Sequence, residues 1–228
     1  MADNLSTPAS ALTVEGRRPV FVVGHPRSGT TLVQLLITAH PVFSSAPETH
    51  FFTHVLGAVP DWLNRTIRPD ELHQVFKRLI GKPGIELDNA TLAQITEQAK
   101  NNNGIAPAVL LNTIMEFYAA QQHKHRRWLE KTPRHVNYIP QILTLFPDAR
   151  IINIVRDPRD VVSSNVRFQK LSPEKDSAER RRICVERSQS WNQMVRYAQR
   201  LLPNEPRLFT VRYEDLIIDT VGSLTRLM

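Results

Sequence analysis

Two polar segments of this 228-residue sequence carry the residue types that hold phosphate or sulfate. The first reads GHPRSGTT at positions 24–31 and places one cation, Arg27, among glycines and hydroxyls. The second contains Arg156, then Ser164 eight positions later, then Arg167. Guanidinium groups bind anions tightly when hydroxyl or backbone N–H donors converge with them. Both segments are therefore candidate anion sites, and the first would use Arg27, Ser28, Gly29, Thr30 and Thr31.

The first segment lies between a strand pattern and a helix pattern. Val20 to Val23 form a continuous β-branched and aromatic run, as in a strand buried on both faces. Apolar residues at helical spacing follow Gly29, and a helix N-terminus favours an anion at its backbone N–H groups. The nucleotide loop G-x-x-x-x-G-K-[ST] has lysine where this chain has Thr30. The segment predicts a phosphate site unlike a usual Mg–ATP site, with an empty glycine turn as the alternative.

Further strand patterns alternate with helix patterns along the chain, at 43–46, 128–130, 149–155 and 208–211. This alternation predicts an α/β fold of the P-loop type, with three α/β/α layers and a mainly parallel sheet. Helix patterns between 59 and 125 predict a helical insertion. Ligands of such sheets bind beyond the carboxyl ends of the strands. We therefore expect one shared edge for residues that each follow a predicted strand, namely the loop after Gly24, Lys131, Arg156 and Tyr213.

Composition limits the classes of partner. A net charge of +7 and a pI near 9.9 favour anionic partners. Nucleic acid is not the expected one, because no basic–aromatic stacking platform is visible. A single cysteine, Cys184, excludes an internal disulfide and a multi-cysteine zinc site. No apolar run approaches the roughly 20 residues that span a bilayer. Residues 1–16 predict a disordered tail without signal-peptide features, so we expect a cytoplasmic protein.

Both anion segments resemble motifs of the sulfotransferase superfamily. PRSGTTL at 26–32 is similar to the loop that binds the 5′-phosphosulfate of 3′-phosphoadenosine-5′-phosphosulfate (PAPS), in the form of the tyrosylprotein branch and its bacterial relatives. RIINIVRDPRDVVSSNVR at 150–167 is similar to the family's 3′-phosphate motif. The resemblance implies PAPS as cosubstrate without a metal. It assigns the 3′-phosphate to Arg156 and Ser164, a further contact to Arg167, and a place near the nucleotide to Tyr213.

The same resemblance implies catalytic roles for Glu48, Lys131 and Arg27. Glu48 follows Arg27 by 21 positions, the interval that the tyrosylprotein branch has before its catalytic glutamate, and would accept the hydroxyl proton. Lys131 in LEKTPRH matches the branch's lysine that reaches the bridging oxygen. His50 is the fallback base.

Local evidence leaves a simpler explanation open for each of these residues. Glu48 would also suit the N-terminus of a helix, where the dipole stabilises a carboxylate. Lys131 could be an ordinary solvated lysine, and Arg156 part of a surface ion-pair cluster with neighbouring aspartates. Tyr213 could be a core residue.

The predicted activity is in-line transfer of a sulfuryl group from PAPS to a hydroxyl acceptor: a peptide tyrosine, a sugar, a lipid or a phenol. Two alternatives are a PAPS-binding module without catalysis and an ATP-using P-loop phosphotransferase, which the missing loop lysine disfavours. Sulfotransferases usually continue past a segment like that around Tyr213 into further basic contacts. Residues 17–228 are therefore interpreted as a sulfotransferase domain truncated at its C-terminus, with a homodimer left open.

Overall fold

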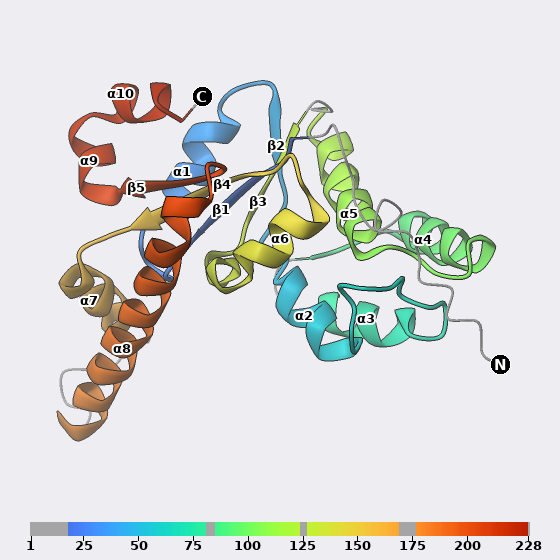
Figure 1. Ribbon diagram of the computed structural model, residues 1–228, viewed down its shortest axis with the longest axis horizontal. Coiled ribbons are helices and arrows are strands. Elements are labelled where there is room, and N and C mark those ends of the chain that lie inside the picture. The colour runs from blue at the N-terminus through green and yellow to red at the C-terminus, as the bar shows by residue number, and fades with distance from the viewer. Residues whose placement is uncertain (1–17, 81–84, 124–126, 169–176, 228) are drawn as a thin grey trace.

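A five-stranded sheet forms the centre of the computed structural model, which describes residues 18–80, 85–123, 127–168 and 177–227 (Figure 1). The predicted tail, residues 1–16, lies outside the described residues. All neighbouring strands pair in parallel, in the order β2-β3-β1-β4-β5. The strands are β1 (Val20–Gly24), β2 (Phe43–Ser45), β3 (Arg127–Lys131), β4 (Arg150–Val155) and β5 (Leu208–Arg212).

Helices connect and cover these strands. They are α1 (Thr30–Thr38), α2 (Phe51–Ala58), α3 (Leu72–Leu79), α4 (Asn89–Asn101), α5 (Pro107–Gln121), the 3₁₀ helix η2 (Pro133–Tyr138), α6 (Ile139–Leu145), α7 (Pro158–Phe168), α8 (Ser177–Leu201), the 3₁₀ helix η3 (Leu202–Asn204), α9 (Tyr213–Ile218) and α10 (Thr220–Thr225). Helices α2 to α5 gather beyond the β2 edge of the sheet, and α9 and α10 lie beside β5 at the other edge (Figure 1).

The sheet is buried on both faces, as its continuous apolar strands predict. Val20 and Val22 of β1 belong to a cluster with residues of α1 and α9. Phe21 belongs to a larger cluster on the opposite face, with residues of α2 to α6 and α8, and its ring lies 5.6 Å from the ring of Trp128. Successive side chains of a strand point to opposite faces, so these two clusters define two helical layers. The predicted three-layer α/β/α fold with a parallel sheet is confirmed.

The segment 136–146, whose apolar pattern predicts helix, is helical in two parts. The 3₁₀ helix η2 comes first, and α6 begins at Ile139. Pro140 explains the break, because proline lacks the N–H that would continue the preceding turn, and it is well placed in the first turn of a new helix.

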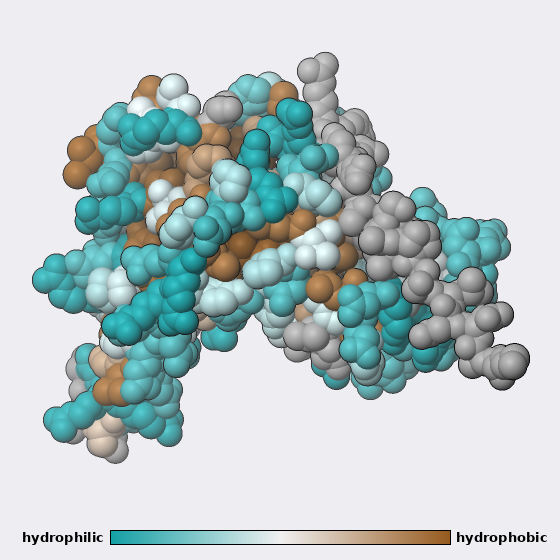
Figure 2. Space-filling model, viewed as in Figure 1, coloured by the Kyte–Doolittle hydropathy of each residue, from teal (hydrophilic) through white to brown (hydrophobic). Residues whose placement is uncertain are grey.

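Helix α8 packs against the rest of the protein mainly through its C-terminal half. Met194, Val195 and Ala198 are buried against the rest of the protein. The outer surface of α8 is largely hydrophilic where the helix projects from the body, and hydrophobic residues gather beside it near α6 (Figure 2). A hydrogen bond also holds α8 against the segment after β4: the indole Nε1 of Trp191 donates to the carbonyl of Arg156 at 3.1 Å.

Candidate active site

A cavity of about 510 Å³ lies at the carboxyl edge of the sheet. Its volume is within the usual range of small-molecule sites. Nine residues singled out from the sequence line it: Arg27, Gly29, Thr30, Thr31, Glu48, His50, Arg156, Ser164 and Tyr213. Ser28 is buried within the loop, and Lys131 is buried behind Glu48. Arg167 is exposed on α7 and does not belong to the lining.

The loop between β1 and α1 has a backbone that only certain residues adopt. Gly29, the residue before α1, has φ 96°, and Arg27 has φ 74°. A Cβ atom at Gly29 would lie 2.3 Å from Cδ2 of Tyr213, so this position also requires glycine for space. Thr30 and Thr31 follow in the first turn of α1 and face the cavity, where the helix dipole favours an anion.

The second anion segment meets the first across the cavity. Nε of Arg27 donates to Oγ of Ser164 at 3.1 Å. The guanidinium of Arg156 lies over the ring of Tyr213, with Cζ 4.3 Å from the ring centroid. Because Tyr213 also packs against Gly29, the tyrosine ring connects the two segments. The two predicted anion sites therefore form parts of one cavity.

Ion pairs also form beside Arg156, as the alternative interpretation expected. Its guanidinium donates to Asp160 at 3.3 Å, and Arg159 pairs with Asp157 at 2.6 Å. Hydrogen bonds from the exposed Arg159 hold the pKa of Asp157 at about 2, well below its usual range. Asp160 nevertheless leaves Nε of Arg156 unused, and this atom has no hydrogen-bond partner among the described residues.

Three buried donors at this cavity have no hydrogen-bond partner among the described residues. They are Oγ of Ser28, Nε of Arg156 and Nε of Arg187. Leaving a buried donor unpaired costs about 1–3 kcal/mol, so such atoms require an explanation. Arg156 and Arg187 line the cavity and Ser28 lies in its loop. A ligand in the cavity with several acceptor oxygens would satisfy the two arginine donors, and phosphate groups fit this donor set.

Sequence reasoning missed Arg187 on α8. It is one of many arginines on a long polar helix, so its type alone carries no signal. Its spacing from Trp191 does carry a signal. Arg187 precedes Trp191 by four positions, so both lie on the helix face that docks against Arg156.

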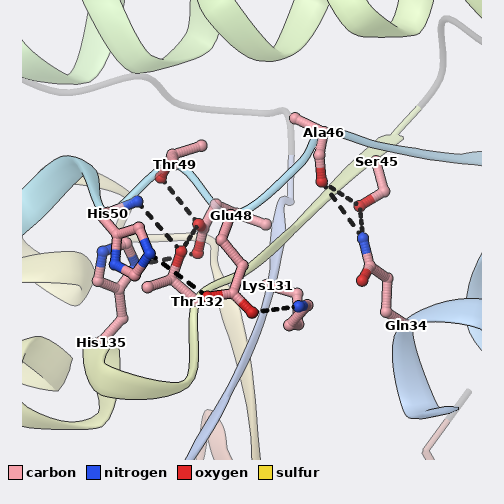
Figure 3. A network of polar contacts seen from close by, with 10 residues as sticks. Gln34, Ser45, Ala46, Glu48, Thr49, His50, Lys131, Thr132 and His135 are labelled. Atoms are coloured by element: carbon pink, nitrogen blue, oxygen red, sulfur yellow. Dashed lines mark hydrogen bonds and ion pairs between the residues drawn. The ribbon is translucent and has the colours of Figure 1, made fainter. Parts of the chain in front are cut away.

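Glu48 of the cavity lining forms an ion pair with the buried Lys131. Nζ of Lys131 donates to Oε1 of Glu48 at 2.5 Å, and Nε2 of His50 lies 3.4 Å from Oε2 of Glu48 (Figure 3). The side chain of Lys131 is 7% exposed and that of Glu48 is 35% exposed, so the carboxylate is the more accessible partner. Burial lowers the pKa of His50, although the charge of Glu48 opposes this shift.

Within the described parts of the chain, no group of three or more His, Cys, Asp or Glu side chains is placed to hold a metal ion. The same residues include no helix that is both long enough and apolar enough to cross a bilayer.

The chain belongs to the sulfotransferase family, whose model matches residues 19–228. This confirms the family that the two motifs resemble. Curated relatives include a putative protein-tyrosine sulfotransferase of Caenorhabditis briggsae, 27% identical over 87% of this chain and 59% of the relative. Another is protein-tyrosine sulfotransferase 2 of Gallus gallus, 26% identical over 92% of this chain and 49% of the relative.

A third relative is bacterial, the omega-hydroxy-beta-dihydromenaquinone-9 sulfotransferase of Mycobacterium bovis, 26% identical over 95% of this chain and 63% of the relative. The chain thus spans less than two thirds of the length of these relatives. The sulfotransferase domain of the Synechococcus PCC 7002 olefin synthase has the same fold, with a TM-score of 0.62, 21% identity, and coverage of 94% of this chain and 74% of that one.

Proposed function

We propose that this protein transfers a sulfuryl group from PAPS to a hydroxyl acceptor. The observation that carries the proposal is the convergence of two anion-binding segments, with unpaired buried donors, beside the Glu48–Lys131 pair. Membership of the sulfotransferase family supports the reaction class. Acceptors of the named relatives include protein tyrosine and a menaquinone derivative, so the acceptor class of this chain stays open among peptide, sugar, lipid and phenol.

The two segments would hold opposite ends of one nucleotide. Arg27, Ser28 and the N–H groups around Gly29, Thr30 and Thr31 would bind the 5′-phosphosulfate. Arg156 and Ser164 would bind the 3′-phosphate, with Tyr213 packed between them and the loop. We add Arg187, whose unpaired Nε points to a phosphate contact, and leave out Arg167, which is exposed on α7 and does not line the cavity.

Glu48, Lys131 and Arg27 would perform the chemistry. Glu48 accepts the proton of the acceptor hydroxyl while the acceptor oxygen forms its bond to sulfur. The bond between sulfur and the 5′-phosphate oxygen breaks, and Lys131 and Arg27 stabilise the negative charge that grows on this leaving oxygen. The products are the sulfated acceptor and adenosine 3′,5′-bisphosphate. One such donor, aimed at developing charge, contributes about 2.7–4 kcal/mol.

A turnover assay tests this proposal. The chain is incubated with PAPS and a panel of acceptors (a tyrosine peptide, a sugar, a lipid alcohol and para-nitrophenol), and release of adenosine 3′,5′-bisphosphate is measured. We expect release that depends on one acceptor and falls about 10²–10⁴-fold in Glu48→Gln. Glu97→Gln makes the same change at an exposed position of α4 and should retain activity. Tight nucleotide binding without turnover on every acceptor would instead indicate a binding module, and magnesium-dependent ATP hydrolysis would indicate a phosphotransferase.

A further inference from the structure

Beneath the Glu48–Lys131 pair lies a second carboxylate, Glu130, that the cavity does not reach. Its side chain is completely buried. One oxygen, Oε1, accepts from Oγ1 of Thr49 at 2.8 Å and from Oγ1 of Thr132 at 2.6 Å. The other, Oε2, lies 2.9 Å from Nδ1 of His135. A buried carboxylate with this many partners is costly to assemble, so its location needs a reason.

The contacts of Glu130 keep it charged. Burial alone raises the pKa of this carboxyl, but the neighbouring His135 and the hydrogen bonds from Thr132 and Thr49 outweigh burial and leave the pKa below its ordinary value. Among the described residues, Glu130 is the only hydrogen-bond partner of the His135 ring, because Nε2 of His135 is buried without a partner. The ring packs edge-on against Phe52, with the ring centroids 4.9 Å apart.

The partners of Glu130 flank the reactive pair in the sequence. Thr49 directly follows Glu48, and Lys131 lies between Glu130 and Thr132. Side chains alternate along a strand, so Glu130 points into the core while Lys131 points to Glu48 on the cavity side. One buried oxygen of Glu130 therefore ties the segment after β2 to the end of β3.

The backbone after Glu48 depends on the same network. His50 has φ 48°, a left-handed conformation that is unfavourable for a residue with a side chain. Its N–H donates to Oγ1 of Thr132 at 3.3 Å, and the next N–H, of Phe51, donates to Oγ1 of Thr49 at 3.1 Å. Both threonines thus hold this turn while they donate to Glu130. Strained turns of this kind persist only where the surrounding contacts fix them.

We propose that Glu130, through Thr49 and Thr132, is a positioning residue that sets where Glu48 stands relative to Lys131 and the acceptor. This inference rests on the proposed function. Buried charges are weak evidence for stability, since well-packed apolar groups often replace them without loss. Placement of a catalytic group is a better reason, because a displacement of 1 Å can cost about 10²-fold in rate.

The test removes one hydroxyl and asks whether the effect acts through Glu48. Thr49→Val keeps the shape of the side chain and deletes its donor to Glu130. We expect kcat to fall about 10–100-fold, with affinity for adenosine 3′,5′-bisphosphate unchanged within about twofold. In a Glu48→Gln background the same substitution should cause no further loss, because the positioned group is already disabled. Thr49→Ser restores the hydroxyl and should restore most of the rate.

A matched control separates positioning from general destabilisation. Thr113→Val makes the same change on α5, where the hydroxyl donates to the carbonyl of Val109 at 3.0 Å, and should leave kcat unchanged. If Thr49→Val unfolds, Glu130→Gln provides the second variant. It replaces the carboxylate that accepts from both threonines with one neutral amide oxygen, a weaker acceptor, and it removes the charge facing His135. It should also lower kcat only when Glu48 is present.

Equal losses in both backgrounds, or no loss in either, would overturn the positioning role. Absence of turnover in the unsubstituted protein would overturn the proposed function and this inference together. Turnover that Thr49→Val leaves intact would overturn this inference alone.

Discussion

Substituting Gly29 by alanine should damage stability and nucleotide binding together. The new Cβ would lie 2.3 Å from Cδ2 and 2.6 Å from Cε2 of Tyr213, so the ring must move. The backbone at φ 96° adds a penalty of about 1–2 kcal/mol for a residue with a Cβ. Together these terms should lower the melting temperature by at least about 2–8 °C for a chain of this size.

The effect on binding follows from the ring of Tyr213. Arg156 lies over this ring, and a cation–π contact contributes about 0.5–2 kcal/mol. Displacing the ring should therefore weaken the binding of adenosine 3′,5′-bisphosphate by roughly 2–30-fold, in addition to any effect of disturbing the loop itself. Isothermal titration calorimetry measures this affinity, and differential scanning calorimetry measures the loss of stability.

Gly104→Ala is the matched control. Gly104 has φ 140°, and a Cβ there would lie 2.4 Å from Oγ1 of Thr66, so the substitution imposes a similar conflict in the helical region between β2 and β3. It should lower the melting temperature without changing nucleotide affinity. Equal nucleotide affinities for Gly29→Ala and Gly104→Ala would refute the reasoning that the loop, Tyr213 and Arg156 act as one unit.

Two further predictions concern other parts of the structure. Arg187→Ala should weaken the binding of adenosine 3′,5′-bisphosphate by roughly 10–150-fold, the value of a charged hydrogen bond. Arg182→Ala, at an exposed position of the same helix, should leave this affinity unchanged. Equal affinities of the two variants in calorimetry would remove Arg187 from the site. Hydrogen bonds from Arg65 hold the pKa of Glu71 below its usual value, so this carboxylate stabilises the fold above about pH 4.3 and the contribution is lost as the pH falls through the lowered value. Glu71→Gln should thus lower the free energy of unfolding most at neutral pH and progressively less in acid. Urea titrations at several pH values measure this loss, with Asp70→Asn as the exposed control. A loss in Glu71→Gln that does not change with pH would contradict the prediction.

Much of the fold could be predicted because buried parallel strands leave a continuous apolar run. Each of the five predicted strands has a counterpart in the sheet. The shared edge followed from the rule on strand ends, which brought Arg27, Arg156 and Tyr213 to one cavity. Helix boundaries were less predictable where a proline interrupts a good apolar pattern, as Pro140 does.

Contacts that depend on register could not be predicted. Glu130 meets Thr49 only because β2 pairs with β3 in the register Ser45 to Leu129, which no local pattern specifies. Arg187 required knowledge of how α8 docks. The disordered tail, the C-terminal truncation, the cytoplasmic location and a homodimer stay predictions from the sequence.

The central claim is that two anion-binding segments hold different phosphates of the same nucleotide. Calorimetric titration of Arg27→Ala and Arg156→Ala with adenosine 3′,5′-bisphosphate and with adenosine 5′-monophosphate tests it most directly. We predict that Arg27→Ala weakens the binding of both ligands. Arg156→Ala should weaken the binding of the bisphosphate by roughly 10–150-fold and leave the affinity for the monophosphate unchanged. If Arg156→Ala lowered the affinity for both ligands equally, or changed neither affinity, the result would contradict the account.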